Sequence, residues 1–236
     1  MRNGQLKPGY NAQVSTNNQF VVNYSLHPNA TDTKTLIAHL KQHKNLFGQL
    51  PQVQVADAGY GSEQNYGYLQ RQGIEAYIKP TDFDRKQRRN YKPNYFATEH
   101  FEYNEAKDQY LCPAGWAMKR IATTEQKEAG VLKTYALYQA KGCRGCALRE
   151  ACHKQKGNRI IKVNHRGRTL KEQAAARLKT QKGIYYRKKR CADVEPVFGN
   201  IKHNKNFKRF LLKGIDKTEI EWGLLCIAHN LKKFAA

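Results

Sequence analysis

The sequence predicts a mixed α/β domain that carries a small, cysteine-bearing, β-rich insert. Three observations support this prediction. Short β-branched runs alternate with helical patterns over the first 80 residues, aromatic runs and four cysteines occupy the middle, and helical periodicity returns in the last third. We therefore expect residues 1–80 and 166–236 to form the two parts of the core, and residues 81–165 to form the insert.

The N-terminal part is expected to run strand, strand, helix, strand, helix, strand. The expected segments are hairpin strands at 9–16 and 19–26, a helix over about 33–46, a strand at 53–57, a helix from 63 to 72 and a strand at 75–80. The pair Asn17-Asn18 is a turn signal between the first two strands, and Gly73 ends the second helix. Asp57 is thereby expected at the end of a buried strand, directly before the turn sequence AGYGS.

The middle and the last third follow different patterns. The aromatic runs HFEYN, QYLCP and TYALY, separated by turn residues, indicate short strands of the insert. Helices are expected at about 170–181, 191–204 and 216–234. In the last of these, apolar residues repeat at intervals of four, three, four and three, as amphipathic helices do. These residues are Ile220, Leu224, Ile227, Leu231 and Phe234.

The charge balance favours a polyanionic partner. The chain has 42 Lys and Arg against 19 Asp and Glu, a formal net charge of +23. Hydrophobic content of 40% with 11% aromatic residues excludes a wholly disordered chain. We expect no membrane span and no secretory signal, because the sequence has neither a long apolar run nor an apolar segment near its start. A reducing, cytoplasmic compartment is therefore expected, where six cysteines favour metal binding over disulfides.

Four cysteines of the middle segment form a candidate structural zinc site. They are Cys112, Cys143, Cys146 and Cys152. Four thiolates make a closed tetrahedral site, which could hold together an insert too small to have a large core. The alternative is a set of buried thiols without a metal, and His153 is a possible replacement ligand. Cys191 and Cys226 lie in predicted helices and are expected to be packing residues.

Two carboxylates are candidates for chemistry. Asp57 follows a predicted strand, where ligands and metals bind in α/β sheets, although an aspartate there can also simply cap a turn. Glu195 and Lys202 share one helical face, next to a face predicted to point into the core. The core-facing residues are Val194, Phe198 and Ile201. The pair is either an exposed ion pair or a metal ligand beside a phosphate-binding cation.

Basic residues surround these positions. Residues 154–190 contain fourteen Lys or Arg and one acid. Lys and Arg give strong, salt-dependent affinity for phosphates, and the neighbouring Tyr185 and Tyr186 could stack on exposed bases. The alternative is a solvated basic face. The candidate DNA-binding residues are Arg187, Lys188, Lys189, Arg190, Lys205, Lys208 and Arg209.

Several motifs together resemble the DDE insertion-sequence transposases. VADAGYGSEQNYGYL at 55–69 resembles their second-aspartate motif, and VEPVFGNIKHNKNFKRFLLKG at 194–214 resembles their glutamate motif. The segment EWGLLCIAHNLKK at 221–233 is also similar to theirs. CPAG at 112–115 and CRGCALREAC at 143–152 resemble the bacterial branch with a cysteine-bearing insert between the two motifs.

The resemblance implies a ribonuclease-H-like fold in which three carboxylates hold two divalent ions, Mg²⁺ or Mn²⁺, for phosphodiester hydrolysis and strand transfer at DNA ends. By position, Asp57 is the second carboxylate, Glu195 the third and Lys202 the lysine of the related signature. That signature also has an arginine four residues before the glutamate, where this chain has Cys191, with Arg190 one residue away. The resemblance further implies DNA as partner, a possible homodimer, and a cytoplasmic, nucleoid-associated bacterial protein.

The first aspartate of the resemblance has no counterpart here. It belongs to a strand ahead of the hairpin, and residues 9–57 already supply the hairpin, helix and strand that follow. Asp32 comes after the hairpin, so topology argues against it as a substitute. We expect an incomplete fold without its first strand, a transposase portion that is inactive alone and that retains DNA binding. The alternatives are a zinc-stapled DNA-binding remnant without catalysis and, less consistent with the motifs, an RNA-binding protein.

Overall fold

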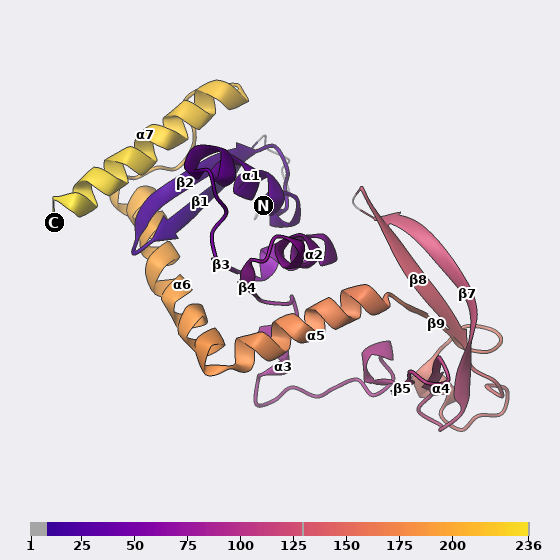
Figure 1. Ribbon diagram of the computed structural model, residues 1–236. Helices are drawn as coiled ribbons and strands as arrows, with labels where there is room; N and C mark the ends of the chain where they lie inside the picture. Colours follow the sequence, from indigo (N-terminus) through magenta and orange to yellow (C-terminus); the bar gives the residue numbers. More distant parts are fainter. Residues whose placement is uncertain (1–8, 129, 236) are drawn as a thin grey trace. The chain divides into compact units, whose positions relative to one another are not determined.

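The computed structural model describes residues 9–128 and 130–235 and divides them into two compact units. The first unit joins the residues up to Phe83 to those from Lys171 onward, and the second comprises Asp84–Leu170. Both units are visible in the ribbon diagram (Figure 1). The mixed α/β class predicted from the sequence is confirmed. No helix of the described segments is long and apolar enough to cross a membrane.

The first unit contains two separate pairs of strands. Strands β1 (Asn11–Asn17) and β2 (Phe20–His27) form the antiparallel hairpin that the sequence predicts. Its two-residue turn has positive φ at both Asn18 and Gln19, the backbone that matches the twist of a hairpin. Strands β3 (Val53–Ala56) and β4 (Glu75–Ile78) pair in parallel. Within residues 9–128 and 130–235, no strand connects the two pairs.

Helices complete the first unit. They are α1 (Leu36–Phe47), α2 (Glu63–Arg71), α6 (Gln181–Gly199) and α7 (Ile215–Phe234), with the short turns η1 (Asp32–Lys34), η2 (Ala58–Tyr60) and η4 (Asn200–Asn204). Side chains cap the N-termini of two of these helices. The Ser62 hydroxyl accepts a hydrogen bond from the Asn65 amide in α2, and the Thr180 hydroxyl accepts one from the Gly183 amide in α6. Helix α5 (His165–Lys179) leads from the second unit into the first. The helix expected at 191–204 thus begins ten residues earlier.

Helix α7 packs through a different face from the one that its apolar spacing indicates. Trp222 and Cys226 are buried against the hairpin, and Gly223 allows the Tyr24 ring of β2 to approach. The five residues of the four-three repeat are all exposed, from 54% for Ile227 to 86% for Phe234. The helix therefore has two apolar faces, and the hairpin covers only one of them.

Other packing expectations are met in part. Of the three residues predicted to face the core, Ile201 of η4 is buried, whereas Val194 and Phe198 of α6 are only half-buried. Cys226 is buried as a packing residue should be, but the same expectation is wrong for Cys191, which is exposed on α6.

The second unit is built on one antiparallel sheet of five strands in sequence order. They are β5 (Tyr103–Asn104), β6 (Gln109–Leu111), β7 (Ala117–Glu128), β8 (Val131–Gln139) and β9 (Ile160–Val163). Its short helical segments are η3 (Thr98–His100) and α4 (Arg149–Cys152), and α3 (Phe83–Lys86) lies at the boundary, with Phe83 still in the first unit. Tyr110, Met118 and Tyr138 form its fully buried centre. The aromatic runs therefore do form strands, because their large rings supply the core of this small unit.

Candidate active site

Asp57 lies directly after β3, as predicted, and its carboxylate serves two partners. One oxygen, Oδ1, accepts a hydrogen bond from the Gly59 amide at 2.9 Å and so caps the turn η2. The other, Oδ2, lies 3.3 Å from Nη2 of Arg190. The side chain is 46% exposed. Asp57 thus caps its turn and still presents an oxygen to solvent and to a cation.

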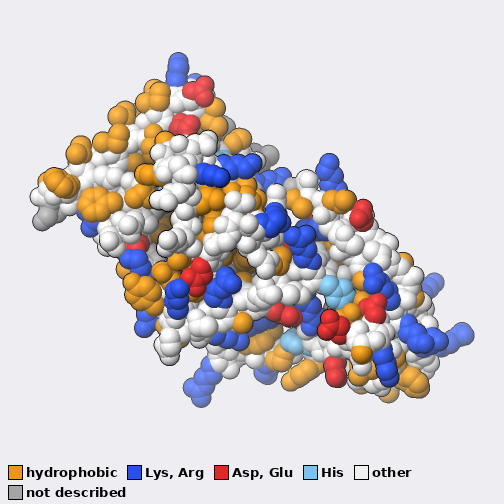
Figure 2. All heavy atoms as spheres, viewed as in Figure 1, with side chains coloured by type: hydrophobic (Ala, Val, Ile, Leu, Met, Phe, Trp, Pro, Cys, Tyr) orange, Lys and Arg blue, Asp and Glu red, His pale blue; other side chains and the backbone are white. Residues whose placement is uncertain are grey.

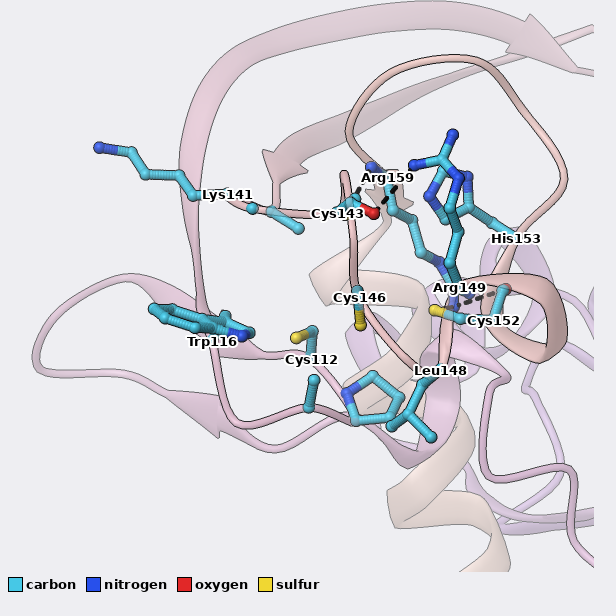
Figure 3. A pocket seen from close by; sticks show the side chains of 14 residues that line it. Cys112, Trp116, Lys141, Cys143, Cys146, Leu148, Arg149, Cys152, His153 and Arg159 are labelled. Atoms are coloured by element: carbon cyan, nitrogen blue, oxygen red, sulfur yellow. Dashed lines mark hydrogen bonds between the residues drawn. The ribbon is translucent and has the colours of Figure 1, made fainter.

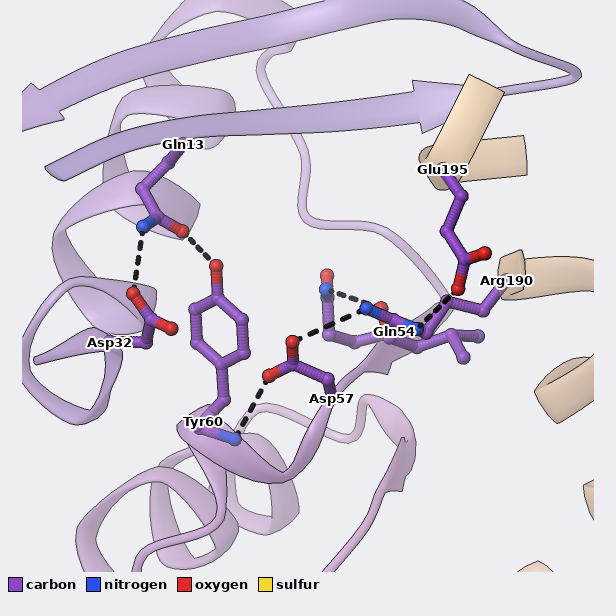
Figure 4. Close-up of polar contacts among 9 residues, drawn as sticks. Gln13, Asp32, Gln54, Asp57, Tyr60, Arg190 and Glu195 are labelled. Atoms are coloured by element: carbon purple, nitrogen blue, oxygen red, sulfur yellow. Dashed lines mark hydrogen bonds and ion pairs between the residues drawn. The ribbon is translucent and has the colours of Figure 1, made fainter. Parts of the chain in front are cut away.

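Arg190 connects Asp57 to Glu195, which comes from a distant part of the sequence. Its Nη1 lies 3.8 Å from Oε1 of Glu195, on the same helix α6, while Nη2 reaches Asp57 (Figure 4). The Arg190 side chain is only 21% exposed, whereas that of Glu195 is 65% exposed. One guanidinium therefore bridges the two predicted carboxylates and balances part of their charge.

A polar network that the sequence analysis did not identify flanks Asp57. Tyr60 donates to the side-chain oxygen of Gln13, and Gln13 in turn donates to Asp32 at 3.2 Å (Figure 4). Burial, with the nearby charges of Asp32 and Asp57, raises the pKa of Tyr60, so its hydroxyl stays protonated and remains a donor. The network holds the turn that carries Asp57 against strand β1.

Gly59 shows how closely the acids approach the turn. A Cβ at this position would lie 2.8 Å from Oδ2 of Asp32 and 3.1 Å from Oδ1 of Asp57, so two carboxylates converge on the space that glycine leaves. Asp32 follows the hairpin in the sequence, so strand topology argues against it as the first carboxylate. The turn η1 nevertheless returns Asp32 to the end of β3, which strand topology alone does not reveal.

A hollow separates the two pairs of strands next to this site. Residues 14–17 of β1 line one side and residues 53–55 of β3 line the other, with Tyr186 and Arg190 from α6 and Leu40 from α1. Each of these two strands is paired on one side only in the part of the chain that the structure describes. The hollow is thus bounded by two unpaired strand edges and covered by helices. A second, smaller pocket lies at the end of β3, and Asp57 and Arg190 are among the residues that line it.

Pro196, next to Glu195, leaves a carbonyl of α6 free to bind the hairpin. A proline inside a helix leaves the carbonyl four residues earlier without its usual donor. Here that carbonyl, of Ala192, accepts from the side chain of Gln19 in the hairpin turn at 2.9 Å. The helix then continues into η4, a single π-helical turn that carries Lys202. Lys202 is exposed, and its Nζ lies 4.9 Å from the centre of the Phe198 ring.

The predicted DNA-binding residues fall into two groups. Arg187 lies over the Phe83 ring at 5.3 Å, Lys189 pairs with Asp193 at 3.2 Å, and Arg190 faces the carboxylates, so these three have partners within the chain. The remaining four are exposed or half-buried at the surface. They are Lys188, Lys205, Lys208 and Arg209.

The four cysteines of the candidate zinc site line one pocket of the second unit (Figure 3). Among residues 9–128 and 130–235, however, no three His, Cys, Asp or Glu side chains are arranged to hold a metal ion. Arg159 explains part of this departure from the predicted site. Its Nη1 donates to the Cys152 sulfur at 2.9 Å and its backbone amide to the Cys143 sulfur at 3.4 Å. The pocket thus gathers the predicted ligands without the arrangement that a tetrahedral ion requires.

His153 lines the same pocket and is the predicted replacement ligand. Both of its ring nitrogens are shielded from solvent, and neither has a hydrogen-bond partner. Burial and the charges of Arg149 and Arg159 lower the pKa of His153, which favours the neutral imidazole.

These features define an α/β domain in which one guanidinium bridges an acid at a strand end and an acid on a helix. Residues 111–235 match a family model described as the transposase DDE domain, and this span exceeds half of the sequence. The chain therefore belongs to the transposase DDE domain family. Glu195, Lys202 and the four cysteines of the pocket lie inside the matched span, whereas Asp57 precedes it. Neither the comparison with curated proteins nor that with solved structures gives a match.

Proposed function

We propose that this chain is the catalytic portion of a DNA transposase, with Asp57 and Glu195 as two of its three carboxylates. The observation that carries the proposal is the bridge through Arg190, which joins an acid after β3 to an acid on α6. Two exposed acids from distant segments gain little stability from such a bridge, so stability alone does not account for the arrangement. Family membership makes phosphodiester chemistry on DNA the best-supported function.

The donor types at this site suit Mg²⁺ or Mn²⁺, because these hard cations prefer carboxylate oxygens. The fit is incomplete, since two carboxylates offset less of the repulsion between two divalent ions than three do, and a guanidinium lies between them. When bound, such ions activate water or a DNA 3′-hydroxyl and stabilise the leaving oxygen. The chain's own contribution is to orient Asp57 through the Gly59 amide, while Arg190 occupies the space between the two acids until a cation replaces it.

We infer that the hollow between β1 and β3 is the place of the first strand of a ribonuclease-H-like sheet. Both bordering edges lack a partner on that side within the described residues, and an unpaired edge is a template for another strand. A strand there, supplied from outside residues 9–235, would run beside β3 and bring a third carboxylate next to Asp57. Without that strand the chain is expected to show little or no strand transfer.

Exposed cations are proposed to hold the DNA backbone next to the acids. Lys202 follows Glu195 by seven residues on the same helical segment, and Lys188, Lys205, Lys208 and Arg209 extend the basic surface. Phosphate contacts of this kind depend steeply on salt and not on sequence. Such a protein would act at the bacterial nucleoid, in the cytoplasm.

DNA binding and DNA cleavage by the chain alone test this proposal. We expect the chain to bind duplex DNA with an affinity that falls steeply with salt, and the double variant Lys208→Ala, Arg209→Ala to lower the log–log salt slope by about 2. Asp57→Asn and Glu195→Gln should not weaken binding, because removing a negative charge does not remove a phosphate contact. Salt-independent binding would contradict the proposal, and efficient metal-dependent nicking by the chain alone would refute the incomplete site.

A zinc-stapled DNA-binding remnant without catalysis is the second candidate. The observation that favours it is the pocket in which His153 keeps two shielded, unpartnered ring nitrogens beside four cysteines. A neutral imidazole and thiolates are the donors that Zn²⁺ prefers, although Arg159 would have to turn away from Cys152. Zinc content of the purified chain tests this directly. One zinc ion per chain that is lost in the variant Cys146→Ser would support a structural ion. A purified chain without bound zinc would rule out the structural zinc site.

A further inference from the structure

The exposed face of α7 carries an apolar row at the spacing of a coiled-coil seam. Its five residues, which we call the α7 stripe, are Ile220, Leu224, Ile227, Leu231 and Phe234, and they are 54–86% exposed. Intervals of four and three residues place side chains along one line of a helix, where a second helix packs. Hydrophobic side chains gather along the outer edge of α7 in Figure 2. Five large apolar residues in one such row are more than the scattered surface residues of a monomer.

The protein's own core does not need this stripe. Trp222 and Cys226 already attach α7 to the hairpin from the opposite face, and His229 and Asn230 bind the backbone of Gln19 and Val21. These contacts fix the rotation of the helix about its axis. Turning the stripe inward would expose Trp222 and break the polar contacts. The stripe is thus held outward by the rest of the unit.

We propose that the α7 stripe is a dimer interface, in which it packs antiparallel against the α7 stripe of a second copy of this chain. The two-fold axis would pass near Ile227, the middle residue of the five. In this register Ile220 lies beside Phe234 of the second copy, and Leu224 lies near Leu231. An isologous contact of this kind closes on itself as a two-fold dimer.

The charges along α7 favour the antiparallel orientation. Beside the stripe, the first part of the helix carries Asp216 and Glu221, with one opposing Lys217, and the last turn carries Lys232. Lys233 instead donates to Gln19 of the hairpin, and Glu219 lies towards Tyr24 and His27 of β2. An antiparallel pair places the acidic part of each copy level with Lys232 of the other, and also opposes the helix dipoles. A parallel pair would align like charges along its whole length.

The available area is of the size that a dimer needs. Taking about 200 Å² for a large side chain in full exposure, the stripe offers on the order of 600 Å² per copy. A stable interface buries about 800 Å² per partner. The exposed Leu211 and Leu212 precede the helix and can add to this area. A second copy covers the stripe without requiring any other partner.

Oligomeric state tests the proposal on the full chain. Sedimentation equilibrium at tens of micromolar protein and high salt, where DNA binding is suppressed, should give twice the chain mass of 27.2 kDa. Ile227→Glu should weaken the dimer by roughly a hundredfold or more, because it places two carboxylates at the two-fold axis. Ile121→Glu, a change of the same kind at a β7 residue that is 50% exposed, is the matched control and should remain dimeric. A monomeric chain, or a dimer that Ile227→Glu leaves intact, overturns the proposal.

Disulfide trapping tests the orientation separately. In a Cys191→Ser background, which removes the exposed native thiol, an equimolar mixture of Ile220→Cys and Phe234→Cys chains should cross-link on oxidation. Ile220→Cys alone should not, since its two copies lie at opposite ends of the interface. Cross-linking of Ile220→Cys with itself would indicate a parallel pair and refute the arrangement. Circular dichroism of each variant verifies that the chain has folded.

Discussion

Replacing Arg190 by glutamine should tighten the binding of a divalent cation at Asp57 and Glu195. The guanidinium lies 3.3 Å from Asp57 and 3.8 Å from Glu195, so it occupies the position from which a cation would meet both carboxylates. A doubly charged ion on those oxygens would lie on the order of 5 Å from the guanidinium. With the dielectric constant of water, the repulsion is about 1.7 kcal/mol. Since about 1.4 kcal/mol is tenfold in affinity, Arg190→Gln should lower the Mn²⁺ dissociation constant roughly tenfold.

Isothermal titration of Mn²⁺ into the folded chain measures this change. Lys189→Gln is the matched control, because it removes the same charge one residue away, from a lysine that pairs with Asp193. Its effect should be several times smaller. Adding Asp57→Asn to Arg190→Gln should abolish the gain. If Arg190→Gln binds Mn²⁺ no more tightly than the unchanged chain, or if the gain persists without Asp57, the carboxylate pair is not a cation site.

Two further predictions concern the unit that carries the site. Gly223→Ala should destabilise the fold by about 1–3 kcal/mol despite the better helix propensity of alanine, because its Cβ would clash with the Tyr24 hydroxyl. Gly199→Ala, with nothing within 4 Å of the added Cβ, should stabilise the fold by up to about 1 kcal/mol. Denaturant unfolding compares the two variants, and equal effects would contradict the packing at Gly223. Burial, reinforced by the charges of His27 and His43, lowers the pKa of His39 from 6.5 to about 4. The unfolded chain therefore binds the proton more readily, and the stability that neutral His39 provides is complete above pH 6.5 and is lost as the pH falls towards 4, by at most about 3 kcal/mol. His39→Asn should reduce the change in the free energy of unfolding between pH 6.5 and pH 4. An unchanged pH dependence would exclude His39 as its source.

The strands and helices of the first unit could be predicted because their signals are local. Alternation with Asn17-Asn18 predicts the hairpin, and the β-branched run before Asp57 predicts β3. These elements together fix Asp57 at a strand end. The motif with Glu195 and the family match then agree on the class of protein.

What could not be predicted depends on contacts between distant segments. Helical periodicity identifies an apolar face of α7 but does not tell which of two faces meets the hairpin, and that depends on Trp222 and on the space at Gly223. Pro196 lies inside α6 because Gln19, far away in the sequence, satisfies the carbonyl that the proline leaves. Strand topology places Asp32 after the hairpin, but a short turn brings its carboxylate back towards Asp57.

The arrangement of the four cysteine side chains could not be predicted from the sequence either. Their spacing brings all four to one pocket, but Arg159, which the pattern does not include, binds two of the sulfurs. Spacing along the chain constrains which residues can meet. It does not determine the direction of each side chain or the neighbours that compete for it.

Metal-dependent cleavage of DNA tests the central claim most directly. For this test the chain is extended at its N-terminus by a short apolar strand ending in aspartate, the kind of strand that we propose for the hollow between β1 and β3. With Mg²⁺ or Mn²⁺, the extended chain should nick DNA. Asp57→Asn and Glu195→Gln should each abolish nicking, whereas the control Glu219→Gln should not. Nicking that survives loss of Asp57 and Glu195 would contradict the assignment of the site, and equal nicking without the extension would contradict the missing strand.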